Sequence, residues 1–335
     1  MLIFLHEFVT GGGWYAHGPE PPPTSLTAEG RAMLQALAAD FSAVSGTSVE
    51  VTRDVRLRQC ALAGCAIHEV ASRAGECQAI KRLSAAADWT VIIAPEFCGH
   101  LTERCRAVEQ AGGRLLGPGS ILVALASDKQ ATAEHLVSGG VSVPRGLALA
   151  PSEHWPAEFD YPAVLKPRDG AGSQGIERIA TRPAGRTNCD TAMRLEAFCP
   201  GTAASVAVLC GPRQIVPLAP CLQRLDAASL AYLGGSLPIE PGLARRAARL
   251  AVQAIGTFDN PLGYIGVDLI LGNAASGADD VVIEINPRIT TSYVGLRALA
   301  RGNLAASMID VAEGREVELC WQSGPIQFEA AGDVR

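Results

Sequence analysis

The sequence predicts an α/β fold that begins with an open parallel sheet. Over roughly the first 115 residues, short apolar stretches alternate with stretches of helical periodicity, and this alternation favours a parallel, doubly wound sheet. The first apolar stretch, residues 2–5, opens directly onto a glycine-rich loop, as in sheets that bind ligands at the carboxyl ends of their strands. With 335 residues, of which 48% are hydrophobic, the chain can bury a sizeable core divided over about two to three domains.

The elements of this first part follow from the spacing of apolar residues. We expect helices where apolar residues recur at helical spacing, and strands where they alternate or run together. In chain order these segments are a helix at 26–44, a strand at 48–53, a helix at 70–87, a strand at 89–94, a helix at 101–111 and a short strand at 114–116.

The loop after the first strand contains Glu7, Thr10, Gly11, Gly12 and Gly13. Consecutive glycines let backbone N–H groups approach an anion closely, and Glu7 and Thr10 add polar groups at the same strand end. We therefore expect this loop to form part of a ligand site, with a flexible turn as the alternative. Its spacing is not GxGxxG, which disfavours a nicotinamide dinucleotide.

Composition narrows the class of partner. The net charge of −6 and the absence of a basic stripe argue against nucleic acid, so an acidic chain that binds phosphate must concentrate its positive charge locally. The ten cysteines include no CxxC pair, so neither a disulfide framework nor a zinc site is expected. No apolar run is long enough for a membrane span, and the N-terminal stretch lacks a basic region before it. We expect a soluble, cytoplasmic protein.

The next helices lead to a lysine in an unusual place. We expect a helix at 117–127 and another that begins at Asp128 and Lys129 and ends before Gly139. Asp128 suits the N-cap. Lys129 lies in the first turn, where the helix dipole disfavours a cation, so it is either solvated or held by an anion. Taken alone, this residue favours the solvated interpretation.

A second lysine precedes a loop of small residues. The strand expected at 161–168 carries Lys166 near its end. The loop that follows contains Gly170, Ala171, Gly172, Ser173, Gln174 and Gly175. A point charge beside a loop with free N–H groups suits a polyphosphate, although the lysine precedes the glycines and the loop is not a Walker A motif. A hairpin turn with a surface lysine is the alternative.

Residues 194–201 are typical of a linker that crosses between two lobes, and a strand at 205–209 follows it. Such a linker can offer backbone donors and acceptors to a base, with Glu196 as a polar anchor. Residues 245–255 predict a helix with a solvated basic face, and 295–302 predict another. The chain from Cys320 onward is expected to be peripheral.

Two predicted strands near the end of the chain carry polar residues that a core strand would not normally keep. Residues 264–271 contain Asp268, and residues 281–288 contain Glu284 and Asn286. A hairpin centred on the polar turn between them places Asp268 opposite Glu284, on the face that also holds Asn286. Three oxygen ligands without nearby Cys or His favour Mg²⁺ over zinc. A hairpin with scattered polar residues is the alternative.

The order of these motifs resembles that of the ATP-grasp carboxylate–amine ligases over nearly the whole chain. The resemblance rests on Asp128-Lys129, on Lys166 to Gly175, on Glu196 to Gly201, and on Asp268 with Glu284 to Arg288. It implies an N-terminal open parallel-sheet (pre-ATP-grasp) domain followed by two α+β lobes that clasp ATP. The expected boundaries are 1–116 for the N-terminal domain, 117–198 for the small lobe with its glycine-rich loop, 199–322 for the large lobe with its metal site, and 323–335 for a tail.

The resemblance also implies a role for each motif. Lys129 and Lys166 would bind the phosphates, and residues 170–175 would close over them. Adenine would be recognised by Glu196 and by the backbone of Ala197 and Phe198. The metal would be bound by Asp268, Glu284 and Asn286. One or two Mg²⁺ ions are expected, for which Mn²⁺ can substitute. Arg288, together with Lys166, is expected to stabilise charge on the transferred phosphoryl group. Two positions depart from the family pattern, because Thr202-Ala203-Ala204 stands where many members carry a ribose-binding Glu and Gly266 where some carry an Arg.

The opening stretch, Phe4 to Gly13, resembles the branch of this family that joins L-glutamate to tyramine in the biosynthesis of methanofuran-type cofactors. This implies activation of the γ-carboxylate of L-glutamate and attack by the amine of tyramine, or of tyrosine. The expected substrate residues are Glu7, Thr10, Gly11, Gly12, Gly13, Thr290, Thr291 and Tyr293, beside Arg288. The alternatives are a ligase for other amino acids or peptides, an ATP-dependent carboxylating enzyme, and a non-catalytic ATP-binding regulatory module. A homodimer is left open.

Overall fold

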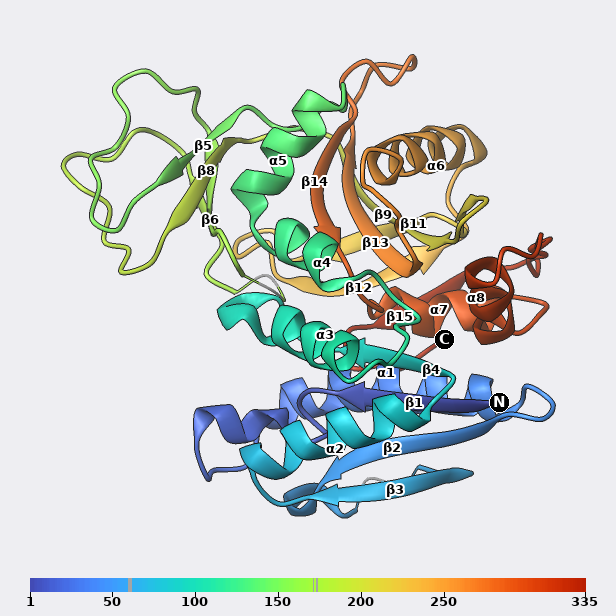
Figure 1. Cartoon of the computed structure of the whole chain (residues 1–335). Helices are drawn as coiled ribbons and strands as arrows, with labels where there is room; N and C mark the ends of the chain where they lie inside the picture. Colours follow the sequence, from blue (N-terminus) through green and yellow to red (C-terminus); the bar gives the residue numbers. More distant parts are fainter. Residues whose placement is uncertain (60–61, 171, 173) are drawn as a thin grey trace.

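The computed structural model describes residues 1–59, 62–170, 172 and 174–335. In this part of the chain the strands form three sheets, of four, four and seven strands (Figure 1). The first sheet belongs to an N-terminal domain, the second to a small lobe that stands to one side, and the third to a large lobe. No helix within the described ranges has the length and apolar character needed to span a bilayer.

The N-terminal domain is built on an open sheet with the strand order β3-β2-β1-β4, in which all pairs are parallel. This confirms the open parallel sheet expected from the sequence. Helix α1 covers one face of the sheet, and α2 and α3 cover the other. The elements are β1 (Leu2–Glu7), η1 (Gly13–His17), α1 (Thr24–Ser42), β2 (Ser48–Asp54), η2 (Val55–Leu57), β3 (Cys65–Val70), α2 (Arg73–Ala86), β4 (Trp89–Ile93), η3 (Phe97–Gly99) and α3 (His100–Gln110).

Three details of this domain differ from the sequence-based expectation. Strand β3 was not expected, because as an edge strand it alternates half-exposed and polar residues and has no continuous apolar run. The helix expected from residue 70 begins only at Arg73, after Ser72 as N-cap. The strand expected at 114–116 contributes a single parallel bridge, between Leu115 and Thr90.

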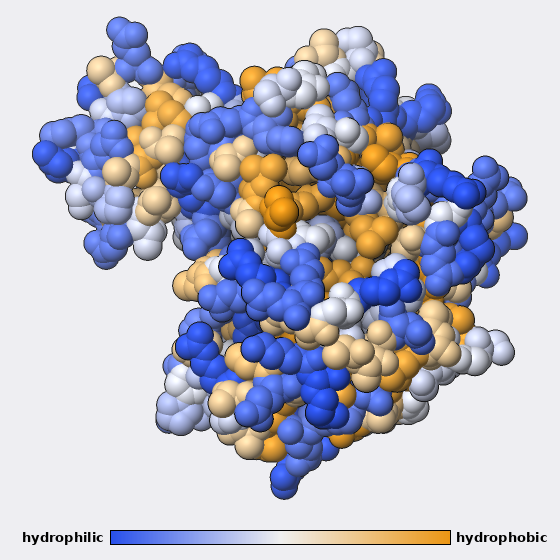
Figure 2. Space-filling view, viewed as in Figure 1, coloured by the Kyte–Doolittle hydropathy of each residue, from blue (hydrophilic) through white to orange (hydrophobic). Residues whose placement is uncertain are grey.

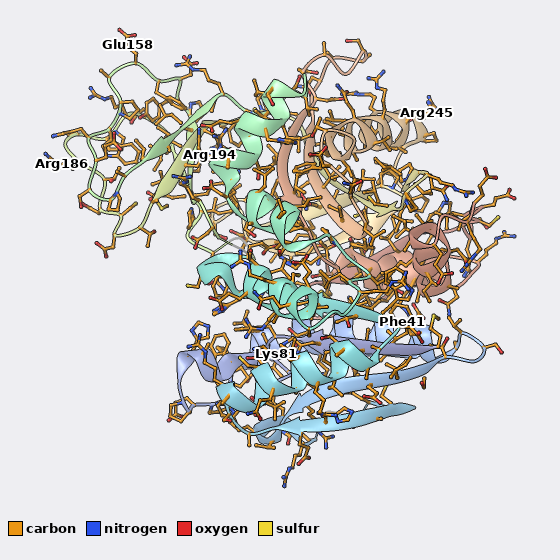
Figure 3. All side chains as sticks on the ribbon, viewed as in Figure 1. Phe41, Lys81, Glu158, Arg186, Arg194 and Arg245 are labelled. Carbon is orange, nitrogen blue, oxygen red and sulfur yellow. The ribbon has the colours of Figure 1, made fainter. Side chains whose placement is uncertain are left out.

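The small lobe is an antiparallel sheet in the order β5-β8-β6-β7 with an apolar core of its own. Helices α4 and α5 lead to it from the N-terminal domain, and the side chain of Asp128 caps α5 as expected. In Figure 3 the labelled side chains of Glu158 and Arg186 lie on loops at the far end of this lobe. The elements are α4 (Ser120–Ser127), α5 (Lys129–Ser138), β5 (Gly146–Leu149), β6 (Ala163–Pro167), β7 (Glu177–Ile179) and β8 (Met193–Ala197).

The large lobe is a sheet in the order β14-β13-β9-β11-β12-β15, with β10 also paired to β9. Helix α6 packs on one face together with α4 and α5, and α7 and α8 pack on the other. The elements are β9 (Thr202–Cys210), β10 (Ile215–Pro217), β11 (Cys221–Leu225), β12 (Tyr232–Leu237), α6 (Pro241–Ile255), β13 (Gly263–Leu271), β14 (Val281–Asn286), α7 (Ser292–Leu299), α8 (Leu304–Ala312) and β15 (Ile326–Glu329).

The last strand corrects the expectation that the chain from Cys320 is peripheral. Strand β15 pairs with β12 and closes the edge of the large sheet. Phe328 is 1% exposed and fills a slot between the two glycines Gly235 and Gly295, at each of which an added Cβ would lie within 2.8 Å of the ring. The tail is therefore part of the core.

We expect Phe328→Ala to lower the free energy of unfolding by about 3–5 kcal/mol, because it removes a buried ring from a slot too rigid to collapse. Urea-induced unfolding followed by circular dichroism measures this. The matched control is Leu233→Ala on β12, whose side chain is 42% exposed and whose loss should cost less than about 0.5 kcal/mol. Equal stability of the Phe328 variant and the wild type would contradict this placement.

One core joins the N-terminal domain to the large lobe. Apolar residues of α1 are buried against β1 on one side and against α7 and α8 on the other. Asp40 of α1 strengthens the joint, because its carboxylate accepts hydrogen bonds from the Tyr293 hydroxyl (2.8 Å) and from Arg297 Nε (3.0 Å). The small lobe has a separate core, so these two parts form one body beside it (Figure 1).

Figure 2 shows apolar residues gathered near the centre of this view, over α4 and the large lobe, with hydrophilic residues along the outer margins of the small lobe and the N-terminal domain.

Candidate active site

A cavity of about 320 Å³ lies between the small lobe and the large lobe. Its walls come from β6 and β8 on one side and from β9, β11, β12, β13 and β14 on the other, with residues 290–292 and one residue of α1 at the end nearest the N-terminal domain. The charged residues of its described lining are Glu29, Lys166, Glu196, Asp268, Glu284 and Arg288. Four carboxylates face two cations, so the lining favours a bound cation.

The two lysines singled out from the sequence converge on strand β14. Lys166, at the end of β6, is 2% exposed, and its ammonium lies 2.6 Å from Glu196 Oε1 and 3.3 Å from the carbonyl oxygen of Ile283. Lys129, in the first turn of α5, is 8% exposed and lies 3.1 Å from Glu284 Oε1. Its ammonium also donates to the carbonyl oxygen of Gly170. The solvated interpretation of Lys129 is therefore wrong.

Glu196 holds buried cations in place. Its second carboxylate oxygen accepts a hydrogen bond from Arg194 Nε at 3.1 Å, and Arg194 also donates to the carbonyl oxygen of Pro144. Figure 3 shows Arg194 on β8, on the side of the small lobe that faces α5. The Glu196 carboxylate therefore contacts both Lys166 and Arg194, which fixes the position of the Lys166 ammonium.

The linker between the lobes runs from the end of β8 at Ala197 to the start of β9 at Thr202, as expected from the sequence. Ala197, Phe198, Cys199 and Gly201 line the cavity. The backbone N–H of Ala197 already donates to the carbonyl oxygen of Arg145 at 2.8 Å, and the backbone N–H of Phe198 donates to the carbonyl oxygen of Pro162 at 3.0 Å. Any contact of these two residues with a base therefore falls to their carbonyl groups.

The hairpin formed by β13 and β14 places Asp268 directly opposite Glu284, as the symmetry of the turn predicted. Asn286 lies on the same wall, and its carboxamide donates to Asp268 Oδ2 at 3.0 Å. Gln223 of β11 donates to the other oxygen of Asp268 at 2.8 Å. Burial, reinforced by the nearby carboxylate of Glu284, raises the pKa of Asp268 to about 7.

This donor set suits a hard divalent cation. Two carboxylates and a carboxamide oxygen are ligands that Mg²⁺ accepts, provided that the Asn286 carboxamide turns its oxygen inward. Only two of these three side chains are carboxylates, and nowhere in the described ranges do three His, Cys, Asp or Glu side chains gather as metal ligands. A cation there would also relieve the unfavourable burial of two adjacent carboxylates.

Arg288 lies at the end of this cavity and connects it to the N-terminal domain. Its guanidinium makes a bidentate ion pair with Glu96, which follows β4, at 2.8 Å and 3.1 Å. Glu96 is 3% exposed. The pair holds the guanidinium of Arg288 toward the N-terminal domain, at the end of the cavity.

A second, smaller cavity of about 90 Å³ opens on the other side of Arg288. Its walls come from the ends of β1 and β4, from η1 and from α1, and they are largely apolar. The two cavities share Glu29, Gly172 and Arg288. We call the smaller one the N-terminal chamber; it is lined by Glu7, Phe8, Val9, Trp14, Leu26, Glu29, Gly30, Met33, Ile93, Ala94, Pro95, Phe97, Gly172, Gln174 and Arg288.

Two family models match this chain. Residues 126–292 match the model described as an ATP-grasp domain, and residues 47–121 match the pre ATP-grasp 3 domain. The chain belongs to the ATP-grasp ligase family.

Curated relatives of this ATP-grasp ligase carry the name tyramine–L-glutamate ligase. The protein of Methanocaldococcus fervens is 27% identical over 231 residues, which cover 69% of this chain and 68% of that one. The protein of Methanocaldococcus jannaschii is 27% identical over 233 residues, which cover 69% and 65% of the two chains. A solved ATP-grasp superfamily protein from Archaeoglobus fulgidus has the same fold, with a TM-score of 0.73 and 23% identity over 98% of this chain and 92% of that chain.

The glycine-rich loop of the ATP-grasp ligase lies where the two cavities meet. Gly172 lines both of them, and Gln174 lines the N-terminal chamber. Asp169, just before the loop, accepts a hydrogen bond from the backbone N–H of Cys98 at 3.2 Å, so the loop also touches the N-terminal domain. Ala171 and Ser173, expected in the same loop, lie outside the described residues.

The expectation for the first loop is only partly met. Glu7 lines the N-terminal chamber, but Thr10, Gly11, Gly12 and Gly13 are absent from the described lining of both cavities. The three glycines are instead required for tight packing, because a Cβ added at any of them would lie within 2.4 Å of a neighbouring atom. The N–H groups of Gly11 and Gly13 are used internally, by the carbonyls of Glu7 and Phe8.

The second group of expected substrate residues is also divided. Thr290 and Thr291 line the large cavity. Tyr293 is wrong as a substrate residue, because its side chain is fully buried and bonded to Asp40. The structure adds Glu29 and Ser292 to this end of the cavity. Neither has a sequence signal that would mark it in advance.

A buried histidine cluster underlies the N-terminal chamber. His6 Nε2 lies 3.1 Å from Glu76 Oε1, and Arg104 forms an ion pair with the same oxygen at 2.6 Å. Burial lowers the pKa of His6, and burial together with nearby Arg104 and His17 lowers the pKa of His100 to about 4. Both imidazoles are therefore neutral in the folded protein at neutral pH.

We expect His6 and His100 to destabilise the folded protein as the pH falls from about 6.5 toward 4, because in that window the unfolded chain binds protons at these imidazoles that the folded chain does not. Asp268 acts in the opposite direction, because its raised pKa gives the folded chain an extra proton. The test therefore compares urea unfolding of the wild type and of His100→Gln at pH 7.5 and pH 5.5. The change in stability on going to pH 5.5 should be less unfavourable in His100→Gln than in the wild type, and an equal change in both would show that His100 titrates normally.

Proposed function

We propose that this ATP-dependent ligase activates the γ-carboxylate of L-glutamate and joins it to the amine of tyramine, releasing ADP and phosphate. The observation that carries the proposal is the arrangement of two cavities around Arg288, one with a lysine-flanked acidic wall and the other with an apolar lining. The name of the curated relatives supports the choice of substrates. We further propose that it acts in the cytoplasm, in the biosynthesis of a methanofuran-type cofactor.

The nucleotide would occupy the cavity between the lobes. The base would lie against the linker, where the carbonyl groups of Ala197 and Phe198 are available as acceptors, and the phosphates would meet Lys129 and Lys166. Both lysines now pair with carboxylates, so a polyphosphate would exchange one anionic partner for another. The loop of Gly170 to Gly175 would cover the phosphates and exclude water.

Asp268, Glu284 and Asn286 would hold Mg²⁺, one ion or two, and Mn²⁺ is expected to substitute. The metal would neutralise phosphate charge during transfer. Release of Lys129 from Glu284 would free that carboxylate as a ligand at the same time as the lysine becomes free for phosphate. The chain's own contribution is to keep these groups in fixed directions, through Gln223 on Asp268 and Arg194 on Glu196.

The reaction has two steps. A carboxylate oxygen of L-glutamate attacks the γ-phosphorus of ATP, a P–O bond forms, and the bond to ADP breaks. The ammonium group of the acceptor first loses a proton to solvent, and its neutral nitrogen then attacks the acyl carbon. A C–N bond forms, the bond from carbon to the phosphate oxygen breaks, a second proton passes from nitrogen to the departing phosphate, and inorganic phosphate leaves. Arg288 would stabilise the charge on the transferred phosphoryl group. The hydroxyls of Thr290, Thr291 and Ser292, at the start of α7, would bind the glutamate.

The test is ADP release with Mg²⁺, ATP and L-glutamate across a panel of amines, with mass spectrometry of the products. We expect ADP and γ-glutamyltyramine in equal amounts, and little ADP when either substrate is omitted. ADP formed with another amino acid in place of glutamate would overturn the acyl donor. Tight ATP binding without turnover for any pair would overturn the enzyme function in favour of a regulatory module.

A further inference from the structure

The N-terminal chamber has a carboxylate without a cation. Glu29, on α1, accepts a hydrogen bond from the Thr291 hydroxyl at 2.7 Å, and within the described ranges no Lys, Arg or His lies at ion-pair distance from it. Glu7 differs, because its carboxylate accepts three hydrogen bonds from the backbone and side chain of its own turn. Glu29 is therefore the acidic group of the chamber that remains available to a ligand.

The position of Glu29 is as informative as its charge. Glu29 lines both cavities, as do Arg288 and Gly172, so it stands at the opening between them. A cationic group bound to Glu29 would lie at the end of the nucleotide cavity where the phosphoryl group and the acyl carbon must meet. The rest of the same ligand would extend into the chamber.

The chamber walls define the rest of that ligand. Phe8, Trp14 and Phe97 contribute aromatic surface, and Leu26 and Met33 of α1 contribute aliphatic surface. Such walls favour an apolar, ring-sized body. The ligand that fits both features is a primary ammonium group attached to an apolar or aromatic body.

The charges of the chamber also disfavour a ligand that carries a carboxylate. Arg288 is the one cation in its described lining, and its guanidinium is already held by Glu96 through two hydrogen bonds. An α-amino acid would bring its carboxylate close to Glu7 and Glu29 with no free cation to meet it. The electrostatics therefore select an amine that has lost, or never had, an adjacent carboxyl group.

We propose that the N-terminal chamber is the acceptor site, and that Glu29 binds the ammonium group and selects a decarboxylated aromatic amine over the corresponding amino acid. This inference rests on the proposed function for the identity of the reaction, but it concerns a binding preference that can be measured without turnover. In reaction terms, the acceptor must come from a decarboxylase that acts on an aromatic amino acid.

The test is calorimetric titration of the wild type and of Glu29→Gln with three ligands, in the presence of a non-hydrolysable ATP analogue and Mg²⁺. The ligands are tyramine, its alcohol analogue 4-(2-hydroxyethyl)phenol, and tyrosine. We expect the wild type to bind tyramine roughly 10- to 100-fold more tightly than either other ligand, as a charge-assisted hydrogen bond provides. In Glu29→Gln, tyramine should lose that advantage while the affinity for the alcohol stays unchanged.

The matched control is Glu20→Gln, an exposed position outside both cavities, which should bind all three ligands as the wild type does. Unchanged tyramine affinity in Glu29→Gln, or tighter binding of tyrosine than of tyramine by the wild type, would overturn the inference. Product analysis separates this failure from that of the proposed function. Glutamyltyramine formed equally by wild type and variant would reject Glu29 alone, whereas Glu29-dependent tyramine binding without any product would reject the reaction alone.

Discussion

Replacing Asp268 with asparagine is expected to reduce ADP formation by at least about 10³-fold while the protein stays folded. The variant keeps the shape of the side chain and one of the two hydrogen bonds that Asp268 accepts, from Gln223 or from Asn286, while its new NH2 group can only donate. It removes one of the two carboxylates that would hold Mg²⁺. Steady-state ADP release at saturating ATP measures the effect, and circular dichroism checks the fold. Glu103→Gln, on the exposed side of α3, is the matched control.

The same substitution should act on stability in the opposite direction. Asp268 and Glu284 face each other across a hairpin in a largely buried wall, so in the absence of a cation their charges repel. We expect Asp268→Asn to melt a few degrees higher than the wild type without Mg²⁺, and the difference to shrink when Mg²⁺ and ATP are added. A lower melting temperature combined with full activity would reject the metal site.

The second large effect is expected at the ion pair between Arg288 and Glu96. Arg288→Met should reduce turnover by about 10²- to 10³-fold, because it removes the guanidinium that we propose stabilises the transferred phosphoryl group. It should also lower the free energy of unfolding by about 3–5 kcal/mol, because Glu96 is left buried and unpaired. Parallel assays of ADP release and of urea unfolding measure the two effects.

A double variant separates these two roles. In Arg288→Met with Glu96→Met the orphaned carboxylate is gone, so stability should return to within about 1 kcal/mol of the wild type. Activity should remain as low as in the single variant. If the double variant recovered activity along with stability, Arg288 would be a structural residue and its place beside the phosphates would be wrong.

The grouping of Asp268, Glu284 and Asn286 on one wall could be predicted from the sequence because it depends on neighbouring residues of one hairpin. Side chains alternate along a strand, which predicts that Glu284 and Asn286 share a face. Placing the centre of the turn at Ser276 pairs Asp268 with Glu284, and this pair forms although an irregularity between Asp268 and Leu269 shifts the register by one residue relative to the pairs nearest the turn. The capped start of α5 was equally local, because a single Asp side chain provides it. These features need no knowledge of the rest of the fold.

The acceptor end of the site could not be predicted in the same way. Glu29 lies on an amphipathic helix, where a Glu is typical of a solvated face, and only the packing of α1 beside residues 290–292 brings it to the cavity. Glu96 and Arg288 are 192 residues apart, so no spacing rule connects them. The interpretation of Gly11, Gly12 and Gly13 as an anion-binding loop failed for a related reason. Glycine permits both the close approach of an anion and tight packing, and only the neighbouring residues in the fold determine which of the two occurs.

The core that joins α1 to α7 and α8 has a consequence for the order in which the protein can be made. During synthesis, the N-terminal domain emerges with one flank of α1 uncovered, including part of the apolar surface around Leu37 and Phe41. The helices that bury this flank, α7 and α8, are synthesised roughly 200 residues after the domain, which at about 5–20 residues per second takes on the order of 10–40 s. During that time the nascent chain exposes an apolar flank of α1 beside the folded N-terminal sheet. Expressing the N-terminal domain without the large lobe would leave the same flank of α1 exposed permanently.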